Sequence, residues 1–135
     1  MLTAKCFADT NVAIYAIEAD AAKRESALAI LVARPVISTQ VVNEYLNVLL
    51  TKRKLDRASA NELARALMAT TEVASVTPDI TELAMHIGER YRINHWDALI
   101  VAAALAAGCA TLYSEDLQDG QVFEERLTVR NPFAA

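Results

Sequence analysis

One segment limits the fold of this chain more than any other. Residues 98–107, with the sequence ALIVAAALAA, carry apolar side chains on every side and are followed by Gly108. Such a segment is typical of a helix that is buried on all of its faces, and glycine often stands just after a helix end. It is too short to cross a bilayer, which takes about 20 residues. We therefore expect a helix in the middle of a layered fold.

Short apolar segments alternate with helical patterns along the rest of the chain. The expected strands are residues 6–8, 35–37, 74–76, 111–113 and 127–129. The other expected helices are residues 12–17, 21–33, 58–69 and 79–91, with one more that begins at Thr39 and ends at the basic residues 52–54. This alternation predicts an α/β fold, in which a parallel sheet has helices on both faces.

Length and charge restrict the organisation and the partners. The chain has 135 residues, just below the ~150 typical of one domain, and contains no repeat or linker, so we expect a single domain over residues 1–135. An apolar content of 54% excludes intrinsic disorder. The formal net charge of −4 provides no excess of basic residues that would hold nucleic acid by charge alone. A polyanionic substrate would need another source of positive charge, such as a divalent cation.

The cysteines and the N-terminal sequence bear on the cellular compartment. Cys6 and Cys109 form no CxxC motif and no Cys/His cluster, which favours a reduced cytosolic protein and leaves one Cys6–Cys109 bridge as an alternative. The first residues, MLTAKCFADTNV, lack the pattern of a signal peptide. We expect a soluble cytoplasmic protein that does not contact a membrane.

Four carboxylates stand where open parallel sheets form their sites, outside the carboxyl ends of the strands. Asp9 and Asp116 follow the first and fourth expected strands, Glu44 lies in the helix after the second strand, and Asp97 lies in the first turn of the apolar helix. No histidine, cysteine or lysine is expected at the same edge. An all-oxygen cluster favours Mg²⁺ or Mn²⁺, which would relieve the repulsion among the carboxylates and activate a water.

Each of these acids also has a purely structural interpretation. Asp9, Asp97 and Asp116 lie near expected helix starts, where aspartate is favoured as a cap or first-turn anion. Glu44 lies beyond the first turn, and its alternative is an ordinary solvated charge. The case for a site depends on the four acids occurring together.

Neighbouring polar residues are further candidates. Thr10, Asn11 and Ser114 are candidates to orient waters around a cation, with turn or capping roles as the alternative. Glu115 and Asp119 remain possible substitutes for Asp116.

The basic segment and the histidines carry weaker signals. Residues 52–54, with Arg57, either steer a phosphate backbone or form the solvated end of a helix. We expect His86 at the surface and His95 at a helix entry.

In its motifs the sequence resembles PIN domains, and in particular VapC-like toxins of type II toxin–antitoxin pairs. The resemblance covers nearly the whole chain and depends on FADTN at 7–11, STQ at 38–40 leading to Glu44, WDALI at 96–100 and YSEDL at 113–117. It implies a three-layer α/β/α sandwich with a mostly parallel five-stranded sheet. The acidic quartet of the family falls on Asp9, Glu44, Asp97 and Asp116, and its small hydroxyl residue falls on Ser114.

The resemblance also implies a function. A VapC-like toxin is an Mg²⁺- or Mn²⁺-dependent endoribonuclease, usually a homodimer, and is inhibited by a cognate antitoxin. Asp9 and Asp97 would be the main direct ligands, and Glu44 and Asp116 would bind the cation directly or through water. A solitary RNA-processing nuclease and a non-catalytic PIN-like module that binds RNA or protein stay open as alternatives. Aspartyl phosphoryl transfer is disfavoured, because Asn11 stands where a haloacid-dehalogenase-type enzyme needs a second aspartate.

Overall fold

A computed structural model describes residues 4–134, which form a six-stranded sheet with the strand order β3-β2-β1-β4-β6-β5. The strands are β1 (Cys6–Ala8), β2 (Val36–Ser38), β3 (Glu72–Ala74), β4 (Thr111–Tyr113), β5 (Val122–Phe123) and β6 (Leu127–Arg130). Every neighbouring pair is parallel except β5 and β6. The expected α/β fold with a mostly parallel sheet is confirmed.

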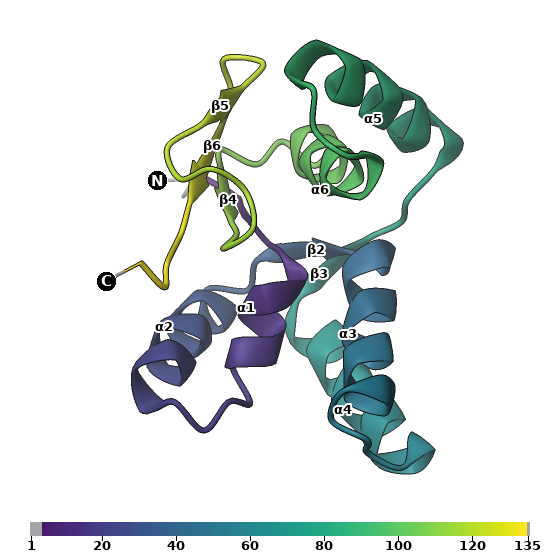
Figure 1. Cartoon of the computed structure of the whole chain (residues 1–135), viewed down its shortest axis with the longest axis vertical. Helices are drawn as coiled ribbons and strands as arrows, with labels where there is room; N and C mark the ends of the chain where they lie inside the picture. The colour runs from purple at the N-terminus through teal and green to yellow at the C-terminus, as the bar shows by residue number, and fades with distance from the viewer. Residues whose placement is uncertain (1–3, 135) are drawn as a thin grey trace.

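The helices cover both faces of this sheet. They are α1 (Thr10–Tyr15), α2 (Ala21–Val32), α3 (Thr39–Thr51), α4 (Arg57–Thr70), α5 (Pro78–Tyr91) and α6 (His95–Ala106). Figure 1 shows α1 to α4 on one side of the sheet and α5 with α6 on the other. Right-handed crossovers explain this arrangement, because the chain steps outward from β1 to β3 and then returns past β1 to β4.

Local sequence determines where the helices begin. Each helix has an Asp, Ser, Thr or Asn side chain at its N-cap, which accepts a hydrogen bond from a backbone N–H of the first turn. The apolar helix α6 is the element predicted most directly by composition. All of its residues from Ala98 to Leu105 are buried.

Three expectations about the fold need correction. The sheet has six strands rather than five, because the two-residue β5 is too short to leave a periodic pattern. The third strand is Glu72–Ala74 rather than 74–76. Asp116 does not lie at a helix start, since turns and the β5–β6 hairpin, not a helix, follow β4.

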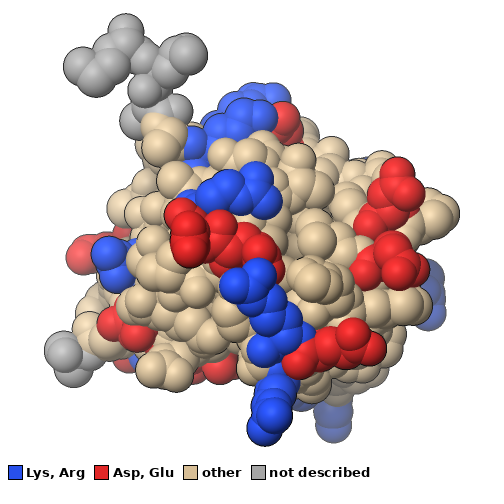
Figure 2. Space-filling view, turned by 90° about the horizontal axis from the view of Figure 1, so that it is seen from above, with Lys and Arg blue, Asp and Glu red and all other residues tan. Residues whose placement is uncertain are grey.

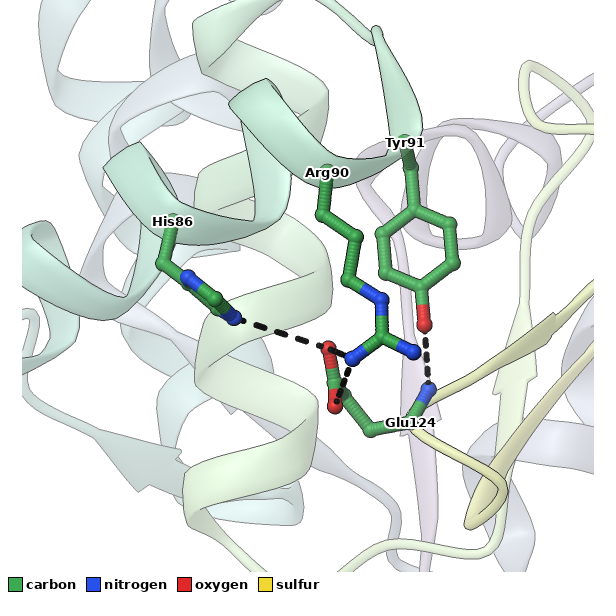
Figure 3. Close-up of polar contacts among 4 residues, drawn as sticks. All are labelled: His86, Arg90, Tyr91 and Glu124. Atoms are coloured by element: carbon green, nitrogen blue, oxygen red, sulfur yellow. Dashed lines mark hydrogen bonds and ion pairs between the residues drawn. The ribbon is translucent and has the colours of Figure 1, made fainter.

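The hairpin turn between β5 and β6 is held by α5 (Figure 3). Glu124 and Glu125 adopt φ values of 53° and 57°, a left-handed conformation in which Asn and Gly are the usual residues of such turns. Arg90 Nη1 lies 3.1 Å from Glu124 Oε2, and Tyr91 Oη accepts a 2.8 Å hydrogen bond from the backbone N–H of Glu124. His86 Nε2 lies 4.0 Å from Glu124 Oε1.

Acidic and basic side chains are interspersed at the end of the molecule where α5 and β5 lie (Figure 2).

The cysteines do not pair. Cys6 and Cys109 are both free thiols, so the bridge considered above is not formed. Among residues 4–134, no helix combines the length and the apolar character that a membrane span needs.

Candidate active site at the carboxyl edge of the sheet

The candidate site lies where the connections of the sheet change direction. The chain leaves β1 toward β2 and β3, whereas it leaves β4 toward β5 and β6 on the opposite side. A crevice forms at such a switch point, outside the carboxyl ends of the strands. Asp9 follows β1 and Ser114 follows β4, and the Asp9 N–H donates a 3.0 Å hydrogen bond to the carbonyl oxygen of Tyr113.

Asp9 is the most buried acid of the site, with 5% of its surface exposed. Its Oδ1 accepts a 2.7 Å hydrogen bond from the Thr10 N–H, and its Oδ2 accepts one of 2.7 Å from the Ser114 hydroxyl. Burial raises the pKa of Asp9 to about 6, and the negative charges of Asp116 and Glu44 add to this rise, whereas the two hydrogen bonds oppose it. Asp9 is therefore a carboxylate whose charge is costly without a nearby cation.

Side chains that follow β1 hold two further acids. Thr10 Oγ1 donates a 2.8 Å hydrogen bond to Glu44 Oε1, which connects α1 to α3. Asn11 Nδ2 lies 3.4 Å from Asp116 Oδ2. The polar residues after β1 thus position the acids that come from α3 and from the segment after β4.

Asp97 is fixed within the first turn of α6. The backbone N–H of Asp97 donates to Asn94 Oδ1 at 2.9 Å, and Asn94 Nδ2 donates back to Asp97 Oδ2 at 2.9 Å. Asn94 is therefore the N-cap of α6, and Asp97 is a first-turn anion, the second of the two structural roles expected for it. Burial raises the pKa of Asp97, and the charge of Asp116 contributes to the rise.

All four predicted acids line one cavity of about 430 Å³: Asp9, Glu44, Asp97 and Asp116. Lys52 and Arg53 also line it, which corrects the expectation that no lysine shares this edge. These basic side chains reach the cavity from the two residues that directly follow α3. Arg53 forms an ion pair with Glu18 at the cavity wall.

The two alternatives to Asp116 are engaged elsewhere. Glu115 Oε1 accepts a 2.9 Å hydrogen bond from the Tyr15 hydroxyl, and Asp119 Oδ1 accepts one of 2.9 Å from the Asn131 N–H. Asp116 lines the cavity with the other three acids. Sequence spacing could not separate these neighbouring residues, because no regular element fixes the direction of their side chains.

The donor chemistry of the cavity fits a hard divalent cation. Its four carboxylates supply oxygen ligands, and two of them have raised pKa values that a cation would lower. The carboxylates are not drawn together: across residues 4–134, no three His, Cys, Asp or Glu side chains are grouped closely enough to hold one metal ion. Each is held apart by its own hydrogen bonds, from Ser114, Thr10, Asn94 or Asn11.

Sequence reasoning missed two residues of this region. Trp96 and Gln40 both line the cavity, and Gln40 Nε2 donates a 3.1 Å hydrogen bond to the Trp96 carbonyl oxygen. Trp96 immediately precedes Asp97, and its side chain is 65% exposed. A tryptophan directly before a candidate ligand is a signal that the sequence contained, although its exposure is known only from the structure.

Comparisons with known proteins identify the same architecture. The family model described as "PIN domain" matches residues 6–119. No curated protein matches the chain in sequence.

Solved structures share the fold at low sequence identity. VapC20 of Mycobacterium tuberculosis, a toxin that cleaves the sarcin-ricin loop, is 23% identical with a TM-score of 0.66, covering 83% of this chain and 90% of that chain. A toxin–antitoxin complex from Klebsiella pneumoniae contains a chain that is 20% identical with a TM-score of 0.74, covering 97% and 100%. DNA-bound VapBC from Salmonella typhimurium contains one that is 17% identical with a TM-score of 0.72, covering 96% and 99%.

Proposed function

The chain belongs to the PIN domain family, and from this premise we propose that it is a metal-dependent endoribonuclease, the toxin of a type II toxin–antitoxin pair. One observation carries the proposal: four carboxylates from four separate segments line a single cavity at the switch point of the sheet. The folds shared with VapC20 and with the toxin–antitoxin complexes support it.

The residues of the cavity have distinct roles in this proposal. Asp9 and Asp97 hold Mg²⁺ or Mn²⁺ directly, and Glu44 and Asp116 hold it directly or through water. When bound, the cation supplies the acidity and the positive charge that hydrolysis of a phosphodiester by water requires. Ser114 fixes the carboxylate of Asp9, and Thr10 fixes that of Glu44.

The basic side chains at the cavity complete the binding of RNA. Lys52 and Arg53 lie on the wall of the cavity that contains the acids. They attract the phosphates of the RNA backbone that flank the reacting one. Arg53 is also paired with Glu18, so, among residues 4–134, Lys52 supplies the free positive side chain at the cavity of a molecule whose net charge is −4.

The second partner in this proposal is an antitoxin with a basic tail. An arginine inserted among the four carboxylates would form charge-assisted hydrogen bonds and occupy the place of the cation. Crosslinking of the co-purified complex tests this: contacts are expected near Asp9 and Asp97. Contacts confined to α4 would contradict occlusion of the cavity.

A homodimer is the assembly that we propose, and the cytoplasm is the proposed compartment. Sedimentation of the purified chain tests the assembly, for which a monomeric mass at all concentrations would be the contrary result. A solitary RNA-processing nuclease would be indicated by the absence of a small antitoxin reading frame beside the gene.

The decisive experiment is an RNA cleavage assay. Purified protein is incubated with structured RNAs in Mg²⁺, in Mn²⁺ and in excess chelator, beside the variants Asp9→Asn and Asp97→Asn. We expect cutting only with a cation, and loss of cutting in both of these variants. Asp119→Asn is the matched control, because Asp119 is three residues from Asp116 but does not line the cavity and accepts a hydrogen bond from the Asn131 N–H. Cutting that persists in chelator would contradict the proposal, and RNA binding without cutting would indicate a non-catalytic module.

A further inference from the structure

A second cavity, of about 630 Å³, adjoins the acidic one and has no role in the chemistry proposed above. It lies between α3 and the first turns of α6, and we call it the α3–α6 cavity. Gln40, Glu44 and Trp96 line both cavities, so the two are continuous. A ligand held at the four acids would therefore extend directly into the α3–α6 cavity.

Trp96 is presented to solvent on a fixed backbone. Its side chain is 65% exposed, although tryptophan is usually among the more buried residues. Its carbonyl oxygen accepts the hydrogen bond from Gln40, which ties the start of α6 to α3. The indole ring is thus available at the boundary of the two cavities, while the segment that carries it is anchored.

The opposite wall of the α3–α6 cavity is a row of carboxamides. Gln40, Asn43 and Asn47 are spaced i, i+3 and i+7, which places them on one face of α3. All three line the cavity, and Asn43 and Asn47 are exposed. A carboxamide offers both donors and an acceptor, as does the edge of a nucleobase. Leu99, which is buried, and Val76 contribute apolar surface.

We propose that the α3–α6 cavity binds one unstacked base of a single-stranded RNA segment, next to the phosphate held at the four acids. Trp96 provides the face on which the base stacks, and Asn43 and Asn47 hydrogen-bond to its edge. Single-stranded RNA is recognised in this way, by aromatic stacking together with contacts to the base edges. The inference depends on the proposed RNA substrate and adds a site that selects the sequence to be cut.

The chemistry of the walls favours a base over a docked helix. A groove for an amphipathic helix presents a continuous apolar surface, whereas the α3 side of this cavity carries three amide side chains and the acid Glu44. Lys52 also lines both cavities and is placed to contact a phosphate between them. The indole of Trp96 matches the face of a base, the amides of Asn43 and Asn47 match its edge, and Lys52 matches the phosphate.

Fluorescence tests the proposal directly, because Trp96 is the only tryptophan of the 135 residues. The full chain, in excess chelator so that no RNA is cut, is titrated with a short single-stranded oligoribonucleotide. A matched series replaces each base in turn by an abasic residue. We expect quenching of Trp96 by the intact oligonucleotide and loss of that quenching when one particular base is missing.

Substitutions separate stacking from a structural role. Trp96→Ala is expected to weaken binding of the intact oligonucleotide by about 5- to 150-fold, the usual range for one base–aromatic stack, whereas Trp96→Phe retains most of it. Asn47→Ala should weaken discrimination among bases. Met85→Ala is the control, because Met85 is an apolar side chain of α5 with 51% exposure. This variant should bind the oligonucleotide as the wild type does. In cleavage assays, Trp96→Ala should raise KM and leave kcat nearly unchanged.

Two results would overturn the proposal. The first is equal quenching by the intact and all abasic oligonucleotides. The second is a combination of two observations: the fluorescence of Trp96 changes with protein concentration in the absence of RNA, and Trp96→Ala dissociates a dimer. This face of the protein would then be a contact between two copies of the chain. If quenching depends on one base but the protein does not cut RNA, the base site in the α3–α6 cavity is supported and the proposed nuclease activity is contradicted. If the protein cuts RNA without such quenching, only the proposed base site is contradicted.

Discussion

The hydroxyl of Ser114 donates a 2.7 Å hydrogen bond to Asp9 Oδ2 across a sequence separation of 105 residues. Ser114 Oγ in turn accepts hydrogen bonds from the backbone N–H groups of Asp116, at 3.1 Å, and Leu117, at 3.4 Å. Ser114 is completely buried. A single hydroxyl therefore fixes the carboxylate that follows β1 and the turn that carries Asp116 after β4.

Removal of this hydroxyl should destabilise the fold. Ser114→Ala leaves a buried carboxylate oxygen and two backbone N–H groups without their partner, so we expect the free energy of unfolding to fall by about 1–3 kcal/mol. Urea unfolding measures the change. Ser75→Ala, at an exposed position, should stay within about 0.5 kcal/mol of the wild type. Equal losses in both variants would show that the Ser114 hydroxyl has no special structural role.

The raised pKa of Asp9 predicts a pH dependence of stability in the metal-free protein. Its pKa in the native state is about 6, and its pKa in the unfolded chain is near the ordinary aspartate value of 3.8. The native state therefore takes up a proton first as the pH falls, so the contribution of Asp9 to stability is fully present below pH ~4 and is lost as the pH rises through 6.

Asp9→Asn isolates this contribution. At pH 7–8 in chelator we expect the variant to be more stable than the wild type by up to about 3 kcal/mol, with the difference disappearing toward pH 4. Urea unfolding over a pH series gives both curves. A difference between the two proteins that is the same at every pH would contradict the assignment.

Metal-dependent stability separates the two roles of Asp97. In chelator, Asp97→Ala keeps the capping hydrogen bond of its backbone N–H but loses the bond from Asn94 Nδ2 and the negative charge in the first turn. We expect a loss of about 0.3–1 kcal/mol, reduced by relief of the burial of that charge. Mg²⁺ at a hundredfold excess over Kd should stabilise the wild type by about 2.7 kcal/mol, and both Asp97→Ala and Asp97→Asn by much less.

Denaturant unfolding with and without Mg²⁺ measures these differences. Asp97→Asn distinguishes the charge from the hydrogen bond, because a carboxamide oxygen can still accept from Asn94 Nδ2 but carries no charge. Asp119→Asn, outside the cavity, should keep the full response to Mg²⁺. The same response in all four proteins would leave Asp97 with its structural role in the first turn of α6 alone.

The salt dependence of RNA binding tests the basic wall of the cavity. Lys52→Gln should weaken binding of a single-stranded RNA and make the plot of log K against log salt shallower by about 0.7 for the phosphate contact that is lost. Lys5→Gln is the control, because Lys5 precedes β1 at the amino ends of the parallel strands, away from the cavity at their carboxyl ends, and pairs with Glu72. A slope that Lys52→Gln leaves unchanged, or that both variants reduce equally, would contradict a local phosphate contact.

Much of the fold was predictable because its signals are local. The apolar composition of α6 indicates burial on all sides, and the caps Asp9, Ser38 and Asn94 mark helix starts by hydrogen bonds that span only a few residues. The alternation of strands and helices predicts a parallel sheet. This topology then brings the ends of β1 and β4 together, so four acids at one edge could be expected from their order in the chain; their role as metal ligands stays a prediction.

Only the tertiary structure decided which side chains face the cavity. Asp116 and Glu115 are adjacent in an irregular turn; Asp116 lines the cavity, whereas Glu115 accepts a hydrogen bond from Tyr15 of α1, which is 100 residues away in the chain. Lys52 enters the cavity because α3 passes beside it, which no pattern within α3 reveals. The sequence by itself determined the elements and their order, since these depend on short-range hydrogen bonds and periodic burial. The direction of each side chain in an irregular segment depends on partners distant in the chain, and those become neighbours only when the sheet has formed.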